Sequence, residues 1–225
     1  MIPWIHLDTA TVPGGGGELK LMQRGDEFSI MAGGIELMNS RLSDSEQALA
    51  RLARERIGDR PKPRVLIGGL GMGFTLRAAL EAFGPQAEIV VAELVPAVLA
   101  WAKGPLAPLY GDSLTDPRTT VKITDVADLI DSPPGSWDAI LLDVDNGPKG
   151  LSRAGNNGLY NGRGLGVAKK SLRPGGVLGV WSSTQDHAFT GRLQRSGFTV
   201  KETMVRAHRG RGARHIVWMA ATPES

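Results

Sequence analysis

The chain has 225 residues, a formal net charge of +3 at neutral pH and no cysteine. A chain of this length is expected to form one main domain with at most a small appendage. The lack of cysteine excludes disulfides, thiolate metal sites and cysteine nucleophiles. No apolar run approaches the roughly 18 residues of a membrane helix, and the first residues lack the layout of a signal peptide. We therefore expect a cytoplasmic protein without a membrane segment.

Residues 1–40 consist of short apolar or alternating stretches separated by glycines. The stretches are Ile2–Leu7, Leu19–Gln23 and Glu27–Met31, with turns at Gly14–Gly17 and Gly33-Gly34. This pattern predicts a β-meander of two to four strands. A sheet this small is not stable alone, so we expect it to pack on a domain formed by residues 41–225.

The remaining chain begins with a helix and then alternates strands with helices. The first helix is predicted to start at Ser43, where Ser43-Asp44-Ser45-Glu46 has the form of a capping box, and to end before Gly58. Further strands are expected at 65–67, 88–92, 120–123, 139–142 and 177–181, and further helices at 75–82, 96–103, 126–130, 158–172 and 186–195. Such alternation predicts an α/β fold with a parallel sheet covered on both faces. The last two strands, 199–205 and 215–220, form a hairpin that predicts an antiparallel edge strand.

A glycine-rich turn, Gly68-Gly69-Leu70-Gly71-Met72-Gly73, joins the first strand of this series to its helix. Glycine lets the backbone approach a ligand closely, and the following helix begins with free N–H groups. The spacing differs from the G-x-G-x-x-G of dinucleotide sites, which argues against an NAD-dependent oxidoreductase. By itself the pattern also fits a tight turn that binds nothing.

Carboxylates follow the next three strands. Glu93 ends the second strand, 20 residues after Gly73, while Asp125 and Asp143 follow the third and fourth strands. In nucleotide-binding α/β sheets an acidic residue after the second strand accepts hydrogen bonds from ribose, and ligands bind beyond the carboxyl ends of the strands. Asp125 alone could equally be a helix cap. Together with the glycine turn, the series predicts a nucleotide-type site.

These motifs resemble those of the spermidine synthase family, the aminopropyltransferases within the S-adenosylmethionine-dependent methyltransferase fold class. The resemblance covers about residues 64–183. It rests on Val65–Arg77 (family VLVIGGGDGGTLR), Ala92–Pro96 (VELDP), Asp116–Thr119 (DPRV), Asp143–Pro148 (DxxDPxGP) and Leu172–Leu178 (LKPGGVL). It implies a Rossmann-like methyltransferase fold with a mostly parallel seven-stranded sheet and an antiparallel C-terminal strand. Met72 stands where the family has an aspartate that helps to hold the donor, and we expect it to face the donor.

The resemblance further implies a site for S-adenosylmethionine or its decarboxylated form, without a metal ion. Its cofactor-binding residues would be Gly69, Gly71, Gly73, Glu93, Asp125 and Asp143. Glu93 would hold the ribose, Asp125 the adenine amine, and Asp143 would orient an attacking amine or accept its proton. An amine must be neutral to attack a sulfonium carbon, so a nearby carboxylate suits this role. The acceptor, a small-molecule amine, would be bound by Asp145, Asn146, Tyr160 and Gln185.

The leading functional prediction is polyamine-related transfer of an aminopropyl group to an amine. A methyltransferase acting on an unidentified small molecule is the main alternative, which Met72 favours, and a non-catalytic nucleotide-binding protein is the alternative of another class. The basic segment 206–215 is interpreted as a solvated hairpin tip; no aromatic residue interleaves its arginines, so we do not expect a nucleic-acid partner. The four histidines lack metal-ligand spacing. A homodimer is implied by the resemblance alone.

Overall fold

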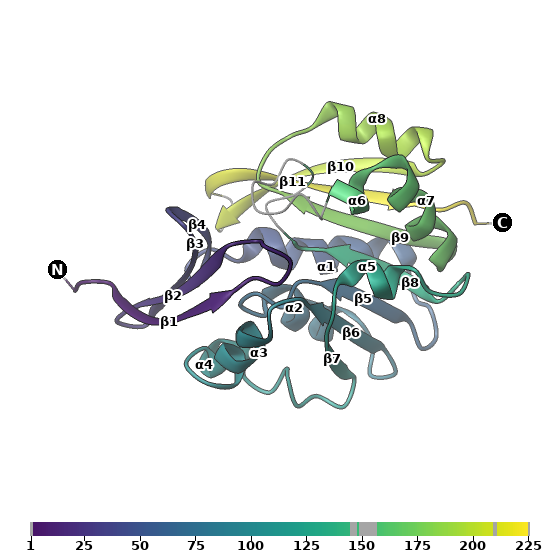
Figure 1. Cartoon of the computed structure of the whole chain (residues 1–225). Helices are drawn as coiled ribbons and strands as arrows, with labels where there is room; N and C mark the ends of the chain where they lie inside the picture. Colours follow the sequence, from purple (N-terminus) through teal and green to yellow (C-terminus); the bar gives the residue numbers. More distant parts are fainter. Residues whose placement is uncertain (1, 145–147, 149–156, 209–210, 225) are drawn as a thin grey trace.

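The computed structural model describes residues 2–144, 148, 157–208 and 211–224. A small antiparallel sheet comes first, with its strands side by side in chain order: β1 (Ile5–Thr11), β2 (Glu18–Arg24), β3 (Glu27–Ala32) and β4 (Ile35–Asn39). The predicted meander is confirmed, although β1 starts later than expected and β4 follows the turn at Gly33-Gly34. Figure 1 shows this sheet, in purple and dark blue, beside the larger sheet.

The larger sheet has seven strands in the order β10-β11-β9-β8-β5-β6-β7. They are β5 (Arg64–Gly68), β6 (Glu88–Glu93), β7 (Thr119–Ile123), β8 (Trp137–Leu142), β9 (Leu172–Ser182), β10 (Thr199–His208) and β11 (Arg211–Ala221). Strands β7, β6, β5, β8 and β9 pair in parallel, and β11 pairs antiparallel with both β9 and β10. The predicted fold class is confirmed.

The antiparallel strand lies inside the sheet, so its expected position at the edge is wrong. β11 is inserted between β9 and β10, and β10 forms the edge. The residues Ile216–Ala221 are all buried, as expected for a strand with neighbours on both sides and covered faces, whereas β10 has exposed positions along its length.

Helices cover both faces of the large sheet. They are α1 (Asp44–Ile57), α2 (Phe74–Ala82), α3 (Pro96–Lys103), α4 (Ala107–Tyr110), α5 (Val126–Ile130), α6 (Asn157–Tyr160), α7 (Gly162–Ser171) and α8 (His187–Arg195). The helix predicted over 158–172 is two helices, because the Asn161 side chain accepts a hydrogen bond from Gly164 N at 2.9 Å and starts α7 anew. Within the described residues, no helix is both long and apolar enough to cross a membrane.

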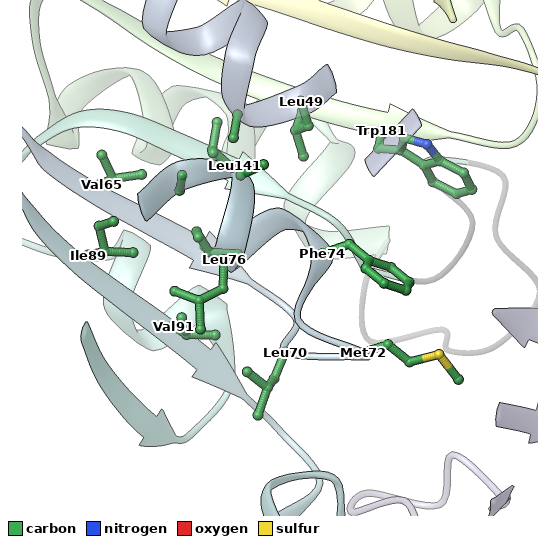
Figure 2. Packing of buried hydrophobic residues seen from close by; sticks show 14 of the residues in the cluster. Leu49, Val65, Leu70, Met72, Phe74, Leu76, Ile89, Val91, Leu141 and Trp181 are labelled. Atoms are coloured by element: carbon green, nitrogen blue, oxygen red, sulfur yellow. The ribbon is translucent and has the colours of Figure 1, made fainter. Parts of the chain in front are cut away.

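Alternating strand residues divide the interior into two apolar clusters. Val65 and Ile67 of β5 pack with α1, α2 and α3, whereas Leu66 packs with α5, α7 and α8. Figure 2 shows the first cluster, including Leu49 of α1 and Leu141 of β8. Side chains of the small sheet join the same cluster: Ala10, Val12, Leu21, Phe28 and Ile30. The two sheets therefore share a core, and a domain boundary between residues 40 and 41 stays a prediction.

The expected capping box at the start of α1 is wrong. The Ser43 side chain caps no backbone N–H; its Oγ accepts a hydrogen bond from Gln47 Nε2 at 2.9 Å. Glu46 accepts a hydrogen bond from Ser45 Oγ instead of reaching back to Ser43. Both Ser45 and Glu46 are buried, so the first turn of α1 directs polar side chains into the protein.

Candidate active site

A cavity lies at the carboxyl ends of β5, β6 and β8. Along the chain the strands are added on one side of β5 (β6, β7) and then on its other side (β8, β9), so the strand order reverses at β5. Ligands of open α/β sheets bind at this kind of position. Gly69, Glu93, Asp125 and Asp143 line the cavity from the strand ends. Its opposite wall comes from the first 40 residues and includes Val12, Leu19, Ile30, Ala32, Leu37 and Met38.

Two glycines of the turn lie where a side chain would collide with a neighbouring element. Gly69 has a φ of +92°, and a Cβ there would lie 2.5 Å from the carbonyl oxygen of Asp143. Gly71 has a φ of +51°, and its Cβ would lie 2.8 Å from Cε of Met38. The turn is thus held between the end of β8 and the small sheet, and both glycines line the cavity.

Gly73 and Met72 lie on the part of the turn that packs against the protein interior. The space beside Gly73 is filled by the ring of Tyr110, whose hydroxyl donates to the carbonyl oxygen of Gly71 at 2.6 Å. Met72 is fully buried in the first apolar cluster (Figure 2), and neither Met72 nor Gly73 is among the described residues that line the cavity. Met72, which was expected to face the donor, therefore lies in the apolar core and does not line this cavity. The methionine on the cavity wall is Met38 of β4.

Glu93 joins the turn to the end of β6. Its Oε2 accepts a hydrogen bond from Leu70 N at 2.9 Å, and its Oε1 accepts one from Val95 N at 2.8 Å. Burial raises the pKa of the Glu93 carboxyl, while the backbone donors oppose the rise. The carboxyl group is therefore held in one orientation at the cavity wall.

Asp125 is both a helix cap and a residue of the cavity wall. It caps α5, where its Oδ1 accepts a hydrogen bond from Ala127 N at 3.0 Å. It also lines the cavity together with its neighbours Thr124 and Val126. Because the cap fixes the backbone of this turn, it also fixes the position of this part of the cavity wall.

Asp143 meets a second carboxyl group that comes from α1. Thr75 Oγ1 donates to Asp143 Oδ2 at 2.6 Å and lies 3.3 Å from the carbonyl oxygen of Glu46. Burial raises the pKa of Asp143 to about 6. Burial also raises the pKa of Glu46 to about 7, and the negative charge of Asp143 contributes to that rise. The two carboxyl groups therefore titrate as a pair near neutral pH.

Of the predicted acceptor residues, the two that the structure describes, Tyr160 and Gln185, lie away from this cavity. Tyr160 lies in the second apolar cluster, where its ring meets Phe189 edge-on with centroids 5.6 Å apart. Gln185 is exposed and donates to Glu202 at 3.2 Å. Neither lines the cavity. Asp145 and Asn146 lie outside the described residues.

Glu46, Met38 and Trp181 line the cavity but were not predicted as ligand contacts. For Glu46 the sequence held a usable signal. It precedes Leu49 by three positions and Ala53 by seven, so it lies on the apolar face of α1. A carboxylate on a buried helix face needs a partner or a function. Met38 and Trp181 carry no such signal, because apolar side chains on strands are expected in any core.

Comparisons with known proteins find relatives in sequence and in fold. No family model matches the chain. A polyamine aminopropyltransferase of Mycobacterium tuberculosis is 29% identical over 168 residues, which cover 72% of this chain and 30% of that protein. The chain thus spans about a third of the length of the curated relatives matched in this way.

Solved spermidine synthases share the fold. The enzyme from Thermotoga maritima superposes with a TM-score of 0.73 at 16% identity, over 98% of this chain and 73% of that one. A spermidine synthase in complex with the transition state analogue AdoDATO gives a TM-score of 0.76 at 16% identity, over 98% and 74%. The chain is thus similar in sequence to polyamine aminopropyltransferases and has the fold of spermidine synthases, which confirms the resemblance that its motifs predicted.

Proposed function

We propose that the chain binds decarboxylated S-adenosylmethionine and transfers the aminopropyl group to an amine, as part of polyamine chemistry. The charge of the cavity carries this proposal. Four carboxyl groups line it, from Glu46, Glu93, Asp125 and Asp143, and the described lining residues include no lysine, arginine or histidine. A cavity with charges of one sign concentrates ligands of the opposite sign. The decarboxylated donor carries two positive charges and no carboxylate, whereas intact S-adenosylmethionine would bring a carboxylate into this field.

The adenosine half of the donor would bind at the strand ends. Glu93 would accept hydrogen bonds from the ribose hydroxyls. The hydrogen bonds from Leu70 N and Val95 N, which fix its carboxyl group at the cavity wall, support this role. Asp125 would accept from the adenine amine, and Gly69 and Gly71 allow the turn to approach the ligand. The apolar lining from Leu94, Val95 and Val126 offers a surface for the adenine ring.

The reaction would take place between Asp143 and the carboxyl group of Glu46. The amine nitrogen attacks the methylene carbon bound to sulfur, the C–S bond breaks, and its electron pair stays on sulfur as a neutral thioether. The attacking nitrogen loses one proton, which Asp143 would accept. A carboxyl group whose pKa lies near neutrality is a better base at pH 7 than an ordinary aspartate. Holding nitrogen, carbon and sulfur in line supplies much of the remaining rate enhancement.

The test is product analysis with both donors. Purified protein is incubated with decarboxylated or intact S-adenosylmethionine and a panel of diamines and triamines, and products are identified by mass spectrometry. We expect aminopropylated amine and methylthioadenosine in equal amounts, with the decarboxylated donor only. A methylated amine would overturn the proposal in favour of a methyltransferase. Binding of the thioether without any product from either donor would leave a non-catalytic nucleotide-binding protein.

We further propose that the protein acts as a homodimer in the cytoplasm. The support is the resemblance alone, so both statements depend on it. Sedimentation equilibrium at several protein concentrations would test the first: a mass twice the 23.9 kDa of the chain is expected, and a monomer at all concentrations would contradict it.

A further inference from the structure

A chain of hydrogen bonds leads from the cavity through α1 to β11. Ser45 Oγ donates to Glu46 Oε2 at 2.5 Å, and the same hydroxyl oxygen lies 2.9 Å from Nδ1 of His215. Ser45 is fully buried, Glu46 is 8% exposed, and His215 is only half-buried. The carboxyl group on the cavity wall is therefore connected, through one hydroxyl, to an imidazole that is partly open to solvent.

The imidazole is held in a defined place. Its ring contacts Trp181 of β9 with centroids 4.8 Å apart, and it lies opposite Val205 of β10 in the sheet register. Arg214 precedes it on the strand and so points to the other face. The neighbouring strands β9 and β10 thus each present an uncharged residue, Trp181 and Val205, to this ring. Burial lowers the pKa of His215, so at neutral pH the ring is neutral and one of its nitrogens is free to accept a proton.

The charged groups near the other end of the hydrogen-bond chain are carboxyl groups. Asp143, at the end of β8, and Asp44, on α1, both raise the pKa of Glu46 by their negative charge. The Glu46–Asp143 pair thus holds a proton near neutral pH. Ser45 provides a direct hydrogen-bonded path for this proton away from the cavity.

We infer that Ser45 and His215 form a relay that carries the proton released in the reaction from the Glu46–Asp143 pair to solvent. This inference rests on the proposed function, in which each transfer releases one proton inside a cavity walled by the small sheet. Neither residue belongs to the sequence motifs that carry the family resemblance.

The relay balances one proton per turnover. The amine nitrogen gives its proton to the carboxylate pair. Once Glu46 is the carboxylic acid, the Ser45 hydroxyl turns from Glu46 toward Nδ1 of neutral His215. Glu46 then donates its proton to Ser45 Oγ while the hydroxyl proton of Ser45 passes to Nδ1. The resulting imidazolium loses its Nε2 proton to water or buffer. Ser45 and the carboxylate pair are returned to their starting states. His215 is left with its proton on Nδ1 and regains the starting tautomer by exchanging protons with water, so no redox partner is needed.

The first arm of the test uses the ligand-free protein and needs no turnover. The ¹⁵N chemical shifts of His215 are followed between about pH 5 and pH 9 by NMR. In the wild type the curve should show a second inflection, because the titrating carboxyl pair is connected to the ring by hydrogen bonds through Ser45. Glu46→Gln and Ser45→Ala should each remove that inflection while the fold is kept. A His215 curve that is identical in wild type and Glu46→Gln would overturn the relay.

The second arm measures turnover with the decarboxylated donor and the best amine from the product screen. His215→Gln can still hydrogen-bond to Ser45 but cannot accept a proton, so kcat should fall about tenfold with the donor KM unchanged. Added imidazole should restore part of the lost rate. His187→Gln, which alters an exposed histidine on α8, is the matched control and should show neither effect.

The outcomes separate the relay from the proposed function. A loss of kcat that imidazole does not restore, or no loss at all, would overturn the relay while leaving aminopropyl transfer intact. A wild type that transfers nothing to any amine would overturn the proposed function, and the NMR curves would still decide whether the hydrogen-bonded path connects His215 to the carboxyl pair.

Discussion

The two sides of the cavity are built in different ways. On the side that we propose binds adenosine, called the adenosine side below, Gly69, Glu93 and Asp125 each lie at or within two residues of the end of a parallel strand, so the spacing of the strands brings them to one edge. The other side takes Met38 from the small sheet and Glu46 from α1. These elements become neighbours only when the small sheet and α1 pack on the large sheet. The first side follows from local sequence pattern, and the second depends on tertiary packing.

The two sides also differ in how their charges are satisfied. Glu93 is hydrogen-bonded to backbone N–H groups and its orientation is fixed before any ligand arrives. Glu46 and Asp143 both line the cavity, and burial raises the pKa of both. An empty acidic side is therefore an unfavourable arrangement that a bound cation would relieve. The adenosine side is expected to provide affinity, and the acidic side to provide selectivity and chemistry.

The largest expected effect is on the acidic side. Asp143→Asn keeps the shape of the side chain but removes its charge and most of its basicity. If Asp143 accepts the amine proton, kcat should fall about 10²–10⁴-fold with little change in affinity for the thioether product. Steady-state kinetics and calorimetry measure the two quantities, with Asp131→Asn, an exposed aspartate after α5, as control. An equal loss of thioether affinity and turnover would mean that Asp143 binds the ligand and does not act in the chemical step.

The next effect concerns the meeting point of the two sides. In Gly69→Ala the new Cβ would collide with the backbone carbonyl of Asp143, which cannot move aside without shifting the end of β8. We expect thioether affinity to fall about tenfold or more, which is at least ~1.4 kcal/mol. Gly166→Ala is the matched control, because nothing lies near its Cβ position on the exposed side of α7. Unchanged affinity in a folded Gly69→Ala would show that the turn does not position the ligand.

A pair of conservative variants separates the two sides directly. Glu93→Gln should weaken binding of the neutral thioether by about 1–3 kcal/mol, because hydrogen bonds to a charged group are lost. Glu46→Gln should leave this affinity nearly unchanged, since the thioether carries no charge for Glu46 to attract. Calorimetry on both variants measures the difference. If both lose affinity equally, the division into an adenosine side and an acidic side is incorrect.

The smallest expected effect is on stability without ligand. The pKa of Glu46 is raised from 4.5 to about 7 in the folded protein, so the folded state binds this proton more tightly than the unfolded chain. Its contribution to stability is complete below the unfolded pKa and is lost as the pH rises through the folded pKa.

Glu46→Gln removes this titration. Relative to wild type, the free energy of unfolding of the variant should therefore rise by about 1–3 kcal/mol between about pH 5 and pH 8, since one pKa unit is about 1.4 kcal/mol. Denaturant unfolding at both pH values measures this change. Glu55→Gln, an exposed position on the same helix, should show no such difference. Parallel curves for Glu46→Gln and wild type would contradict the buried acidic pair.

The residues that could be predicted from the sequence lie mostly at the strand ends, and those that could not be predicted come mostly from the small sheet and α1. Strand ends such as Glu93 and Asp143 were placed correctly, because alternating strands and helices fix which residues meet at the carboxyl edge. Gln185 was expected near the acceptor from the family resemblance, but it lies on the surface beside Glu202. Met72 was expected to face the donor, but its side chain is buried in the first apolar cluster.

The missed residues depend on contacts between distant segments. Met38 meets Gly71 across 33 positions of sequence, and Ser45 meets His215 across 170. No local period encodes such pairs. The position of β11 inside the sheet has the same origin, since a hairpin predicts pairing between β10 and β11 but does not say which of them pairs with β9.

The most direct test of the account is the ratio of two dissociation constants in the wild-type protein, for decarboxylated and for intact S-adenosylmethionine, measured by calorimetry at neutral pH and low salt. The two donors share the adenosine half, so the ratio reports only the acidic side of the cavity. We predict that the decarboxylated donor binds at least about tenfold more tightly, and that added salt and Glu46→Gln both reduce this preference. Equal affinities, or tighter binding of the intact donor, would contradict the claim that four carboxyl groups select a cationic ligand.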